Sequence, residues 1–247
     1  MKYSTLDSGI EFPMGRGRSA RVVSPDVGAE QITLNLSIFE DGDEFPQHIH
    51  DVSEDCFIVL DGSVSLRQGE SYTPLLAGQA VWVPVGEVHG TYNHSGTRAE
   101  LISFQSPPDY ALYRGDRDGA HGELPVYTGP SLSRVVTLGE EKLGSTNGTS
   151  VERGTIRSAV DPERSARHLV VEHITLEPGG RVEVQPDDNE HIVIVLAGHA
   201  EAQRPGVEQL QPRSILYGAP VDGVELVAGS HGALVLHSFA QAKDAGR

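Results

Sequence analysis

Short stretches in which apolar residues alternate with polar ones, or follow one another as β-branched and aromatic residues, recur along the chain. In the first half they are ITLNLSIF (32–39), CFIVLDGSVSL (56–66), AVWVP (80–84) and AELISFQ (99–105). Glycine, proline and aspartate separate these stretches at close intervals. A period of two is typical of half-buried strands, and closely spaced turn residues are typical of an antiparallel sandwich or barrel. The pattern predicts an all-β protein.

The same series of stretches returns in the second half. They are LVVEHITLEPGG (169–180), HIVIVLAGHAEAQ (191–203), SILYGAP (214–220) and ALVLHSF (233–239). Aligning CFIVLDGSV with IVIVLAGHA puts Gly62 and Gly198 in register, so the copies lie 198 minus 62, or 136, residues apart. A repeat of this length indicates a duplicated barrel rather than a solenoid of short repeats.

The repeat predicts two tandem domains joined by a linker. We expect a first barrel over 1–110, a linker over 111–132 and a second barrel over 133–247. The segment between the copies is rich in proline, glycine and charge, which is typical of a connection, and a short helix is expected near 109–114. We expect the first thirty residues to add one or two leading strands to the first barrel.

The charge balance narrows the classes of partner. The chain has 19 Lys and Arg against 35 Asp and Glu, a formal net charge of -16, which repels phosphate backbones and anionic lipid surfaces. No apolar segment reaches the roughly 20 residues that span a bilayer, and the first residues lack the apolar core of a secretory signal. The sequence predicts a cytoplasmic monomer or homodimer that binds a small-molecule substrate, not nucleic acid or a membrane. The lone cysteine, Cys56, is expected to be an inert packed thiol.

Coordinating side chains gather in the stretch GDEFPQHIHDVSEDCFIVLDG (42–62). His48 and His50 are two residues apart, so on a strand they project from the same face. Two imidazoles and a carboxylate suit a divalent metal of the first transition row. The carboxylate is either Glu54 or Asp55, because strand alternation lets only one of the two face the metal.

A third histidine follows in GQAVWVPVGEVHGTYN (78–93). Here a strand ends in Pro84-Val85-Gly86, a tight turn that returns His89 onto the next strand. Three histidines and a carboxylate are then available to one site.

These two stretches resemble the two motifs of the cupin family. The first motif is a glycine, five residues, His-x-His, three or four residues, an acidic residue, six residues and a glycine, and it matches Gly42, His48, His50, Asp55 and Gly62. The second motif is a glycine, five residues, Pro-x-Gly, two residues, a histidine, three residues and an asparagine, and it matches Gly78, Pro84, Gly86, His89 and Asn93.

The resemblance implies a bicupin, that is, two tandem cupin barrels of the double-stranded β-helix or jelly-roll type. It also implies that His48, His50, Asp55 and His89 are the metal ligands. The family usually has glutamate at the acidic position. We prefer Asp55, which holds the aligned place, and Glu54 is the alternative if a β-bulge turns it inward.

The second copy lacks the usual ligands. Counting back from Gly198, His191 takes the place of Asp55, and Gln185 and Asp187 fall near the His-x-His positions. These three residues are the candidates for a second, weaker metal site. The surrounding segment resembles the second barrel of ureidoglycine aminohydrolases, which bind manganese there. Their first barrel carries no metal site, so their activity is not transferred.

A site of three histidines and one carboxylate leaves open positions on the metal, which suits either an oxygenase or a redox-neutral enzyme. We therefore predict a metal-dependent enzyme, with iron, manganese or nickel favoured over zinc and a dioxygenase, an oxidoreductase, as the preferred activity. The alternatives are an isomerase, lyase or cyclase, and a non-catalytic bicupin that binds a small ligand.

The same resemblance leaves roles for the neighbouring side chains. Glu54 is the candidate for proton transfer, although alternation would instead turn the non-ligand acid to solvent. Phe57, Val59 and Trp82 are expected to line a partly apolar pocket, unless Trp82 packs between the sheets.

Overall fold

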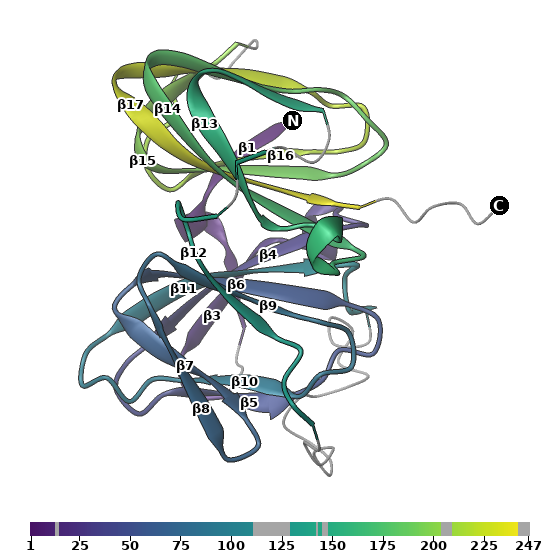
Figure 1. Cartoon of the computed structure of the whole chain (residues 1–247), viewed down its shortest axis with the longest axis vertical. Helices are drawn as coiled ribbons and strands as arrows, with labels where there is room; N and C mark the ends of the chain where they lie inside the picture. The colour runs from purple at the N-terminus through teal and green to yellow at the C-terminus, as the bar shows by residue number, and fades with distance from the viewer. Residues whose placement is uncertain (13–14, 111–128, 142, 145–147, 204–208, 242–247) are drawn as a thin grey trace, which may run out of the picture. The chain divides into compact units, whose positions relative to one another are not determined.

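The computed structural model describes residues 1–12, 15–110, 129–141, 143–144, 148–203 and 209–241. Their regular structure is almost entirely strand, as the alternating pattern predicts (Figure 1). Most of the helix expected near 109–114 lies outside the described residues. No helix in the described part is long and apolar enough to cross a membrane.

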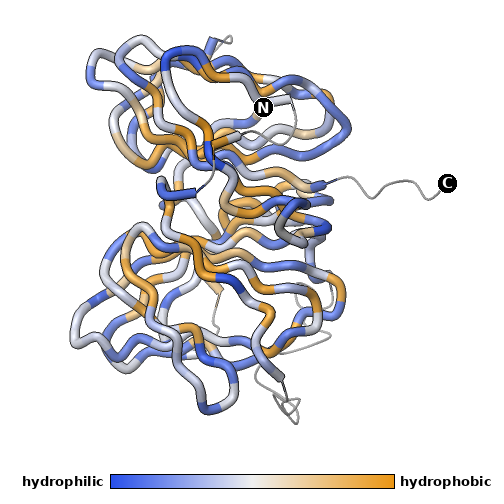
Figure 2. The backbone as a smooth tube through the Cα atoms, viewed as in Figure 1, coloured by the Kyte–Doolittle hydropathy of each residue, from blue (hydrophilic) through white to orange (hydrophobic). Residues whose placement is uncertain are grey.

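The chain divides into two compact units. The N-terminal unit is Gly9–Thr137, and the C-terminal unit combines Met1–Ser8 with Leu138–Arg247. This division differs from the predicted one at two short segments, which are described below. In each unit the hydrophobic stretches run along the strands (Figure 2).

The N-terminal unit consists of two antiparallel sheets. One has seven strands in the order β12-β9-β6-β11-β4-β3-β2, and the other has four in the order β5-β10-β7-β8. The strands are β2 (Ile10–Phe12), β3 (Arg18–Val23), β4 (Thr33–Phe39), β5 (Glu44–His48), β6 (Glu54–Asp61), β7 (Ser63–Gln68), β8 (Ser71–Leu76), β9 (Gln79–Val83), β10 (His89–Tyr92), β11 (Ala99–Ser106) and β12 (Arg134–Thr137), with the 3-10 helix η2 (Pro25–Val27).

Apolar side chains from both sheets meet inside this unit. The seven-stranded sheet contributes Phe39, Phe57 and Leu101, and the four-stranded sheet contributes Leu66 and Leu75. Each of these side chains is at most 4% exposed. Two facing sheets with a shared core are the jelly-roll arrangement that the sequence predicts.

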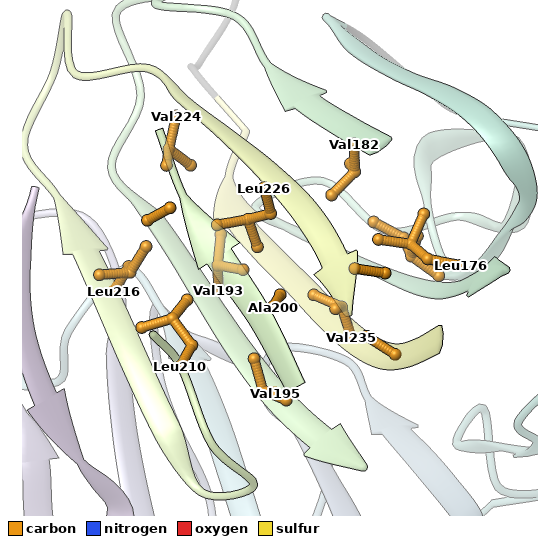
Figure 3. Packing of buried hydrophobic residues seen from close by; sticks show 14 of the residues in the cluster. Leu176, Val182, Val193, Val195, Ala200, Leu210, Leu216, Val224, Leu226 and Val235 are labelled. Atoms are coloured by element: carbon orange, nitrogen blue, oxygen red, sulfur yellow. The ribbon is translucent and has the colours of Figure 1, made fainter. Parts of the chain in front are cut away.

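The C-terminal unit is built on one six-stranded antiparallel sheet in the order β1-β16-β15-β17-β14-β13. Its elements are β1 (Lys2–Thr5), η1 (Leu6–Ser8), β13 (Thr149–Val160), η3 (Pro162–Arg164), β14 (Leu169–Val184), β15 (His191–Ala202), β16 (Ser214–Gly218) and β17 (Val224–Ala240). The long strands contain register shifts where the sheet bends. Its two halves enclose an apolar core that includes Val193, Leu216, Leu226 and Val235 (Figure 3).

Two short strands differ from the predicted domain boundaries. The first residues were expected to join the first barrel, and β2 and β3 do so, but β1 pairs with β16 of the C-terminal unit. Asp7 continues this attachment, because its carboxylate accepts hydrogen bonds of 2.7 and 2.8 Å from Arg213. After the connection, β12 pairs with β9 of the N-terminal unit.

The repeat glycines have the same backbone role in both units. Gly62 and Gly198 both have a φ of 70°, which favours glycine over other residues. A Cβ atom would collide with the Arg98 carbonyl oxygen at Gly62 and with the Gly232 carbonyl oxygen at Gly198. Gly62 separates β6 from β7, whereas Gly198 lies inside β15 next to a register shift; at both positions the repeated glycine allows a second backbone to approach closely.

Candidate metal centre

Three buried histidines converge inside the N-terminal unit. His48 ends β5 and lies opposite His89 at the start of β10, while His50 follows β5. Their ligating nitrogens all lie within 4.8 Å of one another, and the Nε2 atoms of His48 and His50 are 3.1 Å apart. The turn of the second motif is tied to the first, because the Gly86 N–H donates a 2.8 Å hydrogen bond to the His50 carbonyl oxygen.

Backbone carbonyls set the tautomers of two of these rings. Nδ1 of His48 lies 2.8 Å from the Pro46 oxygen, and Nδ1 of His89 lies 2.9 Å from the Glu87 oxygen. A carbonyl oxygen can only accept, so Nδ1 carries the proton and Nε2 keeps its lone pair. Both Nε2 lone pairs are then available to a ligand at the centre.

Asp55 supplies the carboxylate next to the histidines. Its Oδ2 atom is 3.7 Å from Nε2 of His50 and 3.6 Å from Nε2 of His89. Strand β6 pairs regularly with β9 and β11 around this residue, so no bulge brings Glu54 inward. Glu54 lies on the opposite face of β6, where it is 2% exposed. The expectation that the second acid faces solvent is therefore wrong, because that face of the strand is buried as well.

The charge environment differs between the rings. Burial, together with the neighbouring His89 and His50, holds the pKa of His48 well below its usual range, which keeps this imidazole neutral and able to bind a metal. Burial also lowers the pKa of His50, but its interactions with Asp109 and Asp55 outweigh that effect and the net shift is upward. The two carboxylates thus favour a positive charge at this point, and a metal cation satisfies that preference as a proton does.

A second carboxylate and an amide hold His50. Asp109 Oδ2 lies 3.2 Å from Nδ1 of His50, and the Gln105 amide nitrogen lies 3.0 and 3.2 Å from the two ring nitrogens. The Asp109 N–H donates to the Gln105 side-chain oxygen at 3.1 Å, which closes the cluster. Sequence reasoning missed both residues. Gln105 was detectable from strand register, because it lies opposite Asp55 on β11, whereas Asp109 lies after the strand and carries no periodic signal.

The predicted pocket residues divide between two faces. Phe57 and Val59 belong to the interior apolar cluster. Trp82 alternates away from Val81 and Val83, which belong to that cluster, and the Arg134 guanidinium lies 5.4 Å from its ring centroid. The structure therefore does not bring Trp82 to the histidines. Cys56 is fully buried on the same face as Glu54, and burial raises the pKa of its thiol, as expected of an inert packed cysteine.

The second predicted group is arranged differently. Gln185 is exposed, while Asp187 Oδ1 lies 2.8 Å from Nε2 of His191. The chain of contacts continues from Nδ1 of His191 to Nε2 of His237 at 3.0 Å, and from Nδ1 of His237 to Glu172 at 2.9 Å. Within the described part of the chain, His48, His50 and His89 form the one group of at least three His, Cys, Asp or Glu side chains close enough to share a metal.

Two orphaned atoms show that the N-terminal cluster fits a metal. His89 Nε2 and Asp55 Oδ1 are buried and have no hydrogen-bond partner. Buried polar atoms are rarely left unpaired, so both atoms fit a role as ligands of a cation at the centre. Three imidazole nitrogens and a carboxylate oxygen are the donor set of divalent first-row transition metals.

Comparisons with known proteins agree with this geometry. Residues 35–104 match the family model described as a cupin domain, and this segment contains the three histidines and Asp55. A search of curated proteins finds no match.

Solved structures with the same fold cover almost the whole chain. The YlbA protein of E. coli has a TM-score of 0.73 at 10% identity, over 99% of this chain and 92% of that one. A protein of Pseudomonas aeruginosa described as glyoxylate-induced has a TM-score of 0.72 at 15% identity, over 96% and 86%. A Bacillus subtilis oxalate decarboxylase variant has a TM-score of 0.68 at 13% identity, over 97% and 77%. At these identities the likeness shows the fold alone.

Proposed function

We propose that this protein is a metal-dependent bicupin enzyme that acts on a small organic substrate. His48, His50, His89 and Asp55 would hold one divalent transition metal in the N-terminal unit. The observation that carries the proposal is the pair of buried, unpartnered atoms, His89 Nε2 and Asp55 Oδ1, at the point where the histidines converge. The equal φ angles of Gly62 and Gly198, and the close backbone contact at each, support the two-barrel reading.

The chain's own residues prepare this centre for catalysis. Pro46 and Glu87 fix the His48 and His89 rings through their carbonyl oxygens, so little reorganisation is needed when a ligand binds. Phe57 and Val59 give the interior an apolar wall that excludes water. A bound divalent metal would supply Lewis acidity and, if it is iron or manganese, redox chemistry.

The preferred reaction is a dioxygenase reaction, because four protein ligands leave positions on the metal for further groups. A redox-neutral reaction is the second candidate, and one observation favours it. Asp109, a second carboxylate that is 3% exposed, is hydrogen-bonded to His50 and places a further acid-base group next to the metal ligands. The likeness to an oxalate decarboxylase is in keeping with this second candidate.

Metal analysis of the purified protein tests the proposal. We expect about one equivalent of iron, manganese or nickel in the wild type and at least a roughly tenfold loss in His50→Ala. His231→Ala, an exposed histidine of the C-terminal unit, is the matched control and should keep the metal. Wild-type protein without stoichiometric metal after growth in several supplemented media would contradict the proposal.

The same preparations identify the acidic ligand and the reaction class. Asp55→Asn should lose metal as His50→Ala does, whereas Glu54→Gln should keep it, because Glu54 lies on the far face of β6. Oxygen uptake during turnover of a screened substrate supports the dioxygenase. Equal turnover in the absence of oxygen supports the redox-neutral reaction. A protein that holds the metal and binds a small ligand, but does not convert it, is a binding protein.

A further inference from the structure

The inner face of the seven-stranded sheet continues beyond the metal ligands as two rows of side chains. In the first row Asp55 lies opposite Gln105, which lies opposite Thr33. In the second row Phe57 lies opposite Ser103, which lies opposite Asn35. Cross-strand neighbours project from the same face of a sheet, so each row runs from β6 across β11 to β4.

Three observations show that these rows face the interior. Phe57 belongs to the interior cluster, and Phe39, four residues after Asn35 on β4, belongs to it too. Gln105 reaches the ring of His50. The inner face of β4 is thus polar at Thr33 and Asn35, next to the metal centre, and apolar at Phe39.

The polar end of β4 is not satisfied by the protein. Thr33 is 0% exposed, and its Oγ1 atom has no hydrogen-bond partner; the same is true of the buried Oδ1 atom of Asn35. Leaving such groups buried and unpaired costs free energy, so a sequence retains them where something else pairs with them. Together with the orphaned atoms of the metal ligands, they indicate a binding region with polar groups on two sides.

The formal charges around this region restrict what binds there. A divalent metal is balanced by the carboxylates of Asp55 and Asp109, and the neighbouring imidazoles are neutral as ligands. Between β6 and β4 neither row contains a lysine or arginine. The second row continues on β3 to Arg21, which lies opposite Asn35 and whose guanidinium is paired with the Asp26 carboxylate at 3.5 Å. Within the described part of the chain, each positive charge at this site thus faces a carboxylate, and an anionic ligand would find no net positive charge there to attract it.

We propose that Thr33 and Asn35 form the substrate-recognition surface, and that the substrate is an uncharged hydroxy or keto compound. One oxygen of such a compound would face the metal, and its hydroxyl and carbonyl groups would pair with Thr33 and Asn35. This inference rests on the proposed metal centre and adds the class of substrate that the centre accepts.

Cobalt-loaded protein provides the binding test, because the visible spectrum of cobalt responds to a ligand entering its coordination sphere. Hydroxyacetone and glycolate are probes of matched size, one neutral and one anionic. We expect hydroxyacetone to bind at least as tightly as glycolate. Thr33→Val and Asn35→Leu should weaken hydroxyacetone binding roughly tenfold at unchanged cobalt content. Thr73→Val, an exposed threonine of β8, is the control and should bind as the wild type does.

Two results would overturn the inference without affecting the proposed metal centre. One is that the wild type binds glycolate more tightly than hydroxyacetone. The other is that both variants bind hydroxyacetone with the affinity of the wild type. A second measurement does not depend on metal. Because the Thr33 hydroxyl lacks a partner, metal-free Thr33→Val should unfold at the same or a higher temperature than the wild type. A clear fall in its Tm would show that the hydroxyl is paired within the protein and would refute the inference whether or not the wild type binds cobalt.

Discussion

At the scale of single residues, His50 differs from the other two histidines in its partner. His48 and His89 each face a backbone carbonyl, whereas His50 faces the Asp109 carboxylate at 3.2 Å. A carboxylate makes the imidazole a stronger donor and fixes its orientation. Asp109 is therefore a positioning residue for the metal centre.

Replacing Asp109 tests this role. We expect Asp109→Ala to lower the affinity for a divalent metal by about 10- to 100-fold, and Asp109→Asn to lower it less, because the amide oxygen still accepts from Nδ1 but carries no charge. A competition titration with a chelating indicator dye measures both affinities. Asp61→Ala, an exposed acid at the end of β6, is the control. Equal affinities in Asp109→Ala and the wild type would contradict the role.

The acidic pair shows what residue spacing can and cannot predict. The motif alignment placed Asp55 at the ligand position, and strand parity required Glu54 to point the other way; the structure places both side chains accordingly. Strand alternation did not reveal that the other face of β6 is buried too, because burial of that face depends on residues distant in sequence that pack against it. Asp109 was missed because nothing in its local sequence distinguishes it from a turn residue.

At the scale of elements, Glu87 binds residues 131–133, the segment that precedes β12, to the N-terminal unit. Its carboxylate accepts hydrogen bonds of 2.6 Å from the Ser131 hydroxyl and 2.7 Å from the Gln68 amide, and further bonds from Leu132 and Ser133. These contacts lead directly into β12, which pairs with β9. Burial raises the pKa of Glu87, but the hydrogen bonds outweigh it and the net shift is downward.

This lowered pKa makes the contribution of Glu87 depend on pH. A group whose folded pKa is depressed stabilises the protein fully above its unfolded pKa, about 4.3 for glutamate, and loses that contribution as pH falls through the folded pKa. Glu87→Gln should therefore cost about 1 kcal/mol at pH 7, and the difference from the wild type should shrink below about pH 4. Urea unfolding at both pH values measures it, and an equal difference at both would contradict the assignment.

The attachment of β1 offers a test in the C-terminal unit. Leu6, which follows β1, is 1% exposed, and its N–H donates to the Arg213 carbonyl oxygen at 2.9 Å. Leu6→Ala should cost about 2–5 kcal/mol of stability, as large-to-small changes in cores do. Hydrogen exchange should accelerate in β16 and stay unchanged in β6. Exceptionally slow exchange retained in β16 would argue against this attachment.

The sequence predicted the positions of the strands better than it predicted which strands pair with each other. The stretches 32–39, 80–84 and 99–105 correspond to β4, β9 and β11 within a residue at either end, and Gly62 divides 56–66 into β6 and β7. Alternation identifies a strand locally. It does not identify a partner some two hundred residues away, which is why the pairing of β1 with β16 was not predicted.

At the scale of the whole molecule, the two units differ in how the polar groups around their buried histidines are satisfied. In the N-terminal unit several buried polar atoms around the histidines have no partner. In the C-terminal unit, both ring nitrogens of His191 and of His237 have partners, ending at Asp187 and Glu172. Because these ring nitrogens already have partners within the protein, they are not free to bind a metal. We therefore expect the one metal equivalent in the N-terminal unit.

The exchange of short strands between the predicted domains affects the order in which the chain acquires its contacts during synthesis. Residues 2–5 are made before their partner strand, Ser214–Gly218, which follows some two hundred residues later. The N-terminal unit ends at Thr137, so all of its strands are made while β1 is still unpaired. Until β16 emerges, β1 is an open edge that a chaperone or a neighbouring nascent chain can bind.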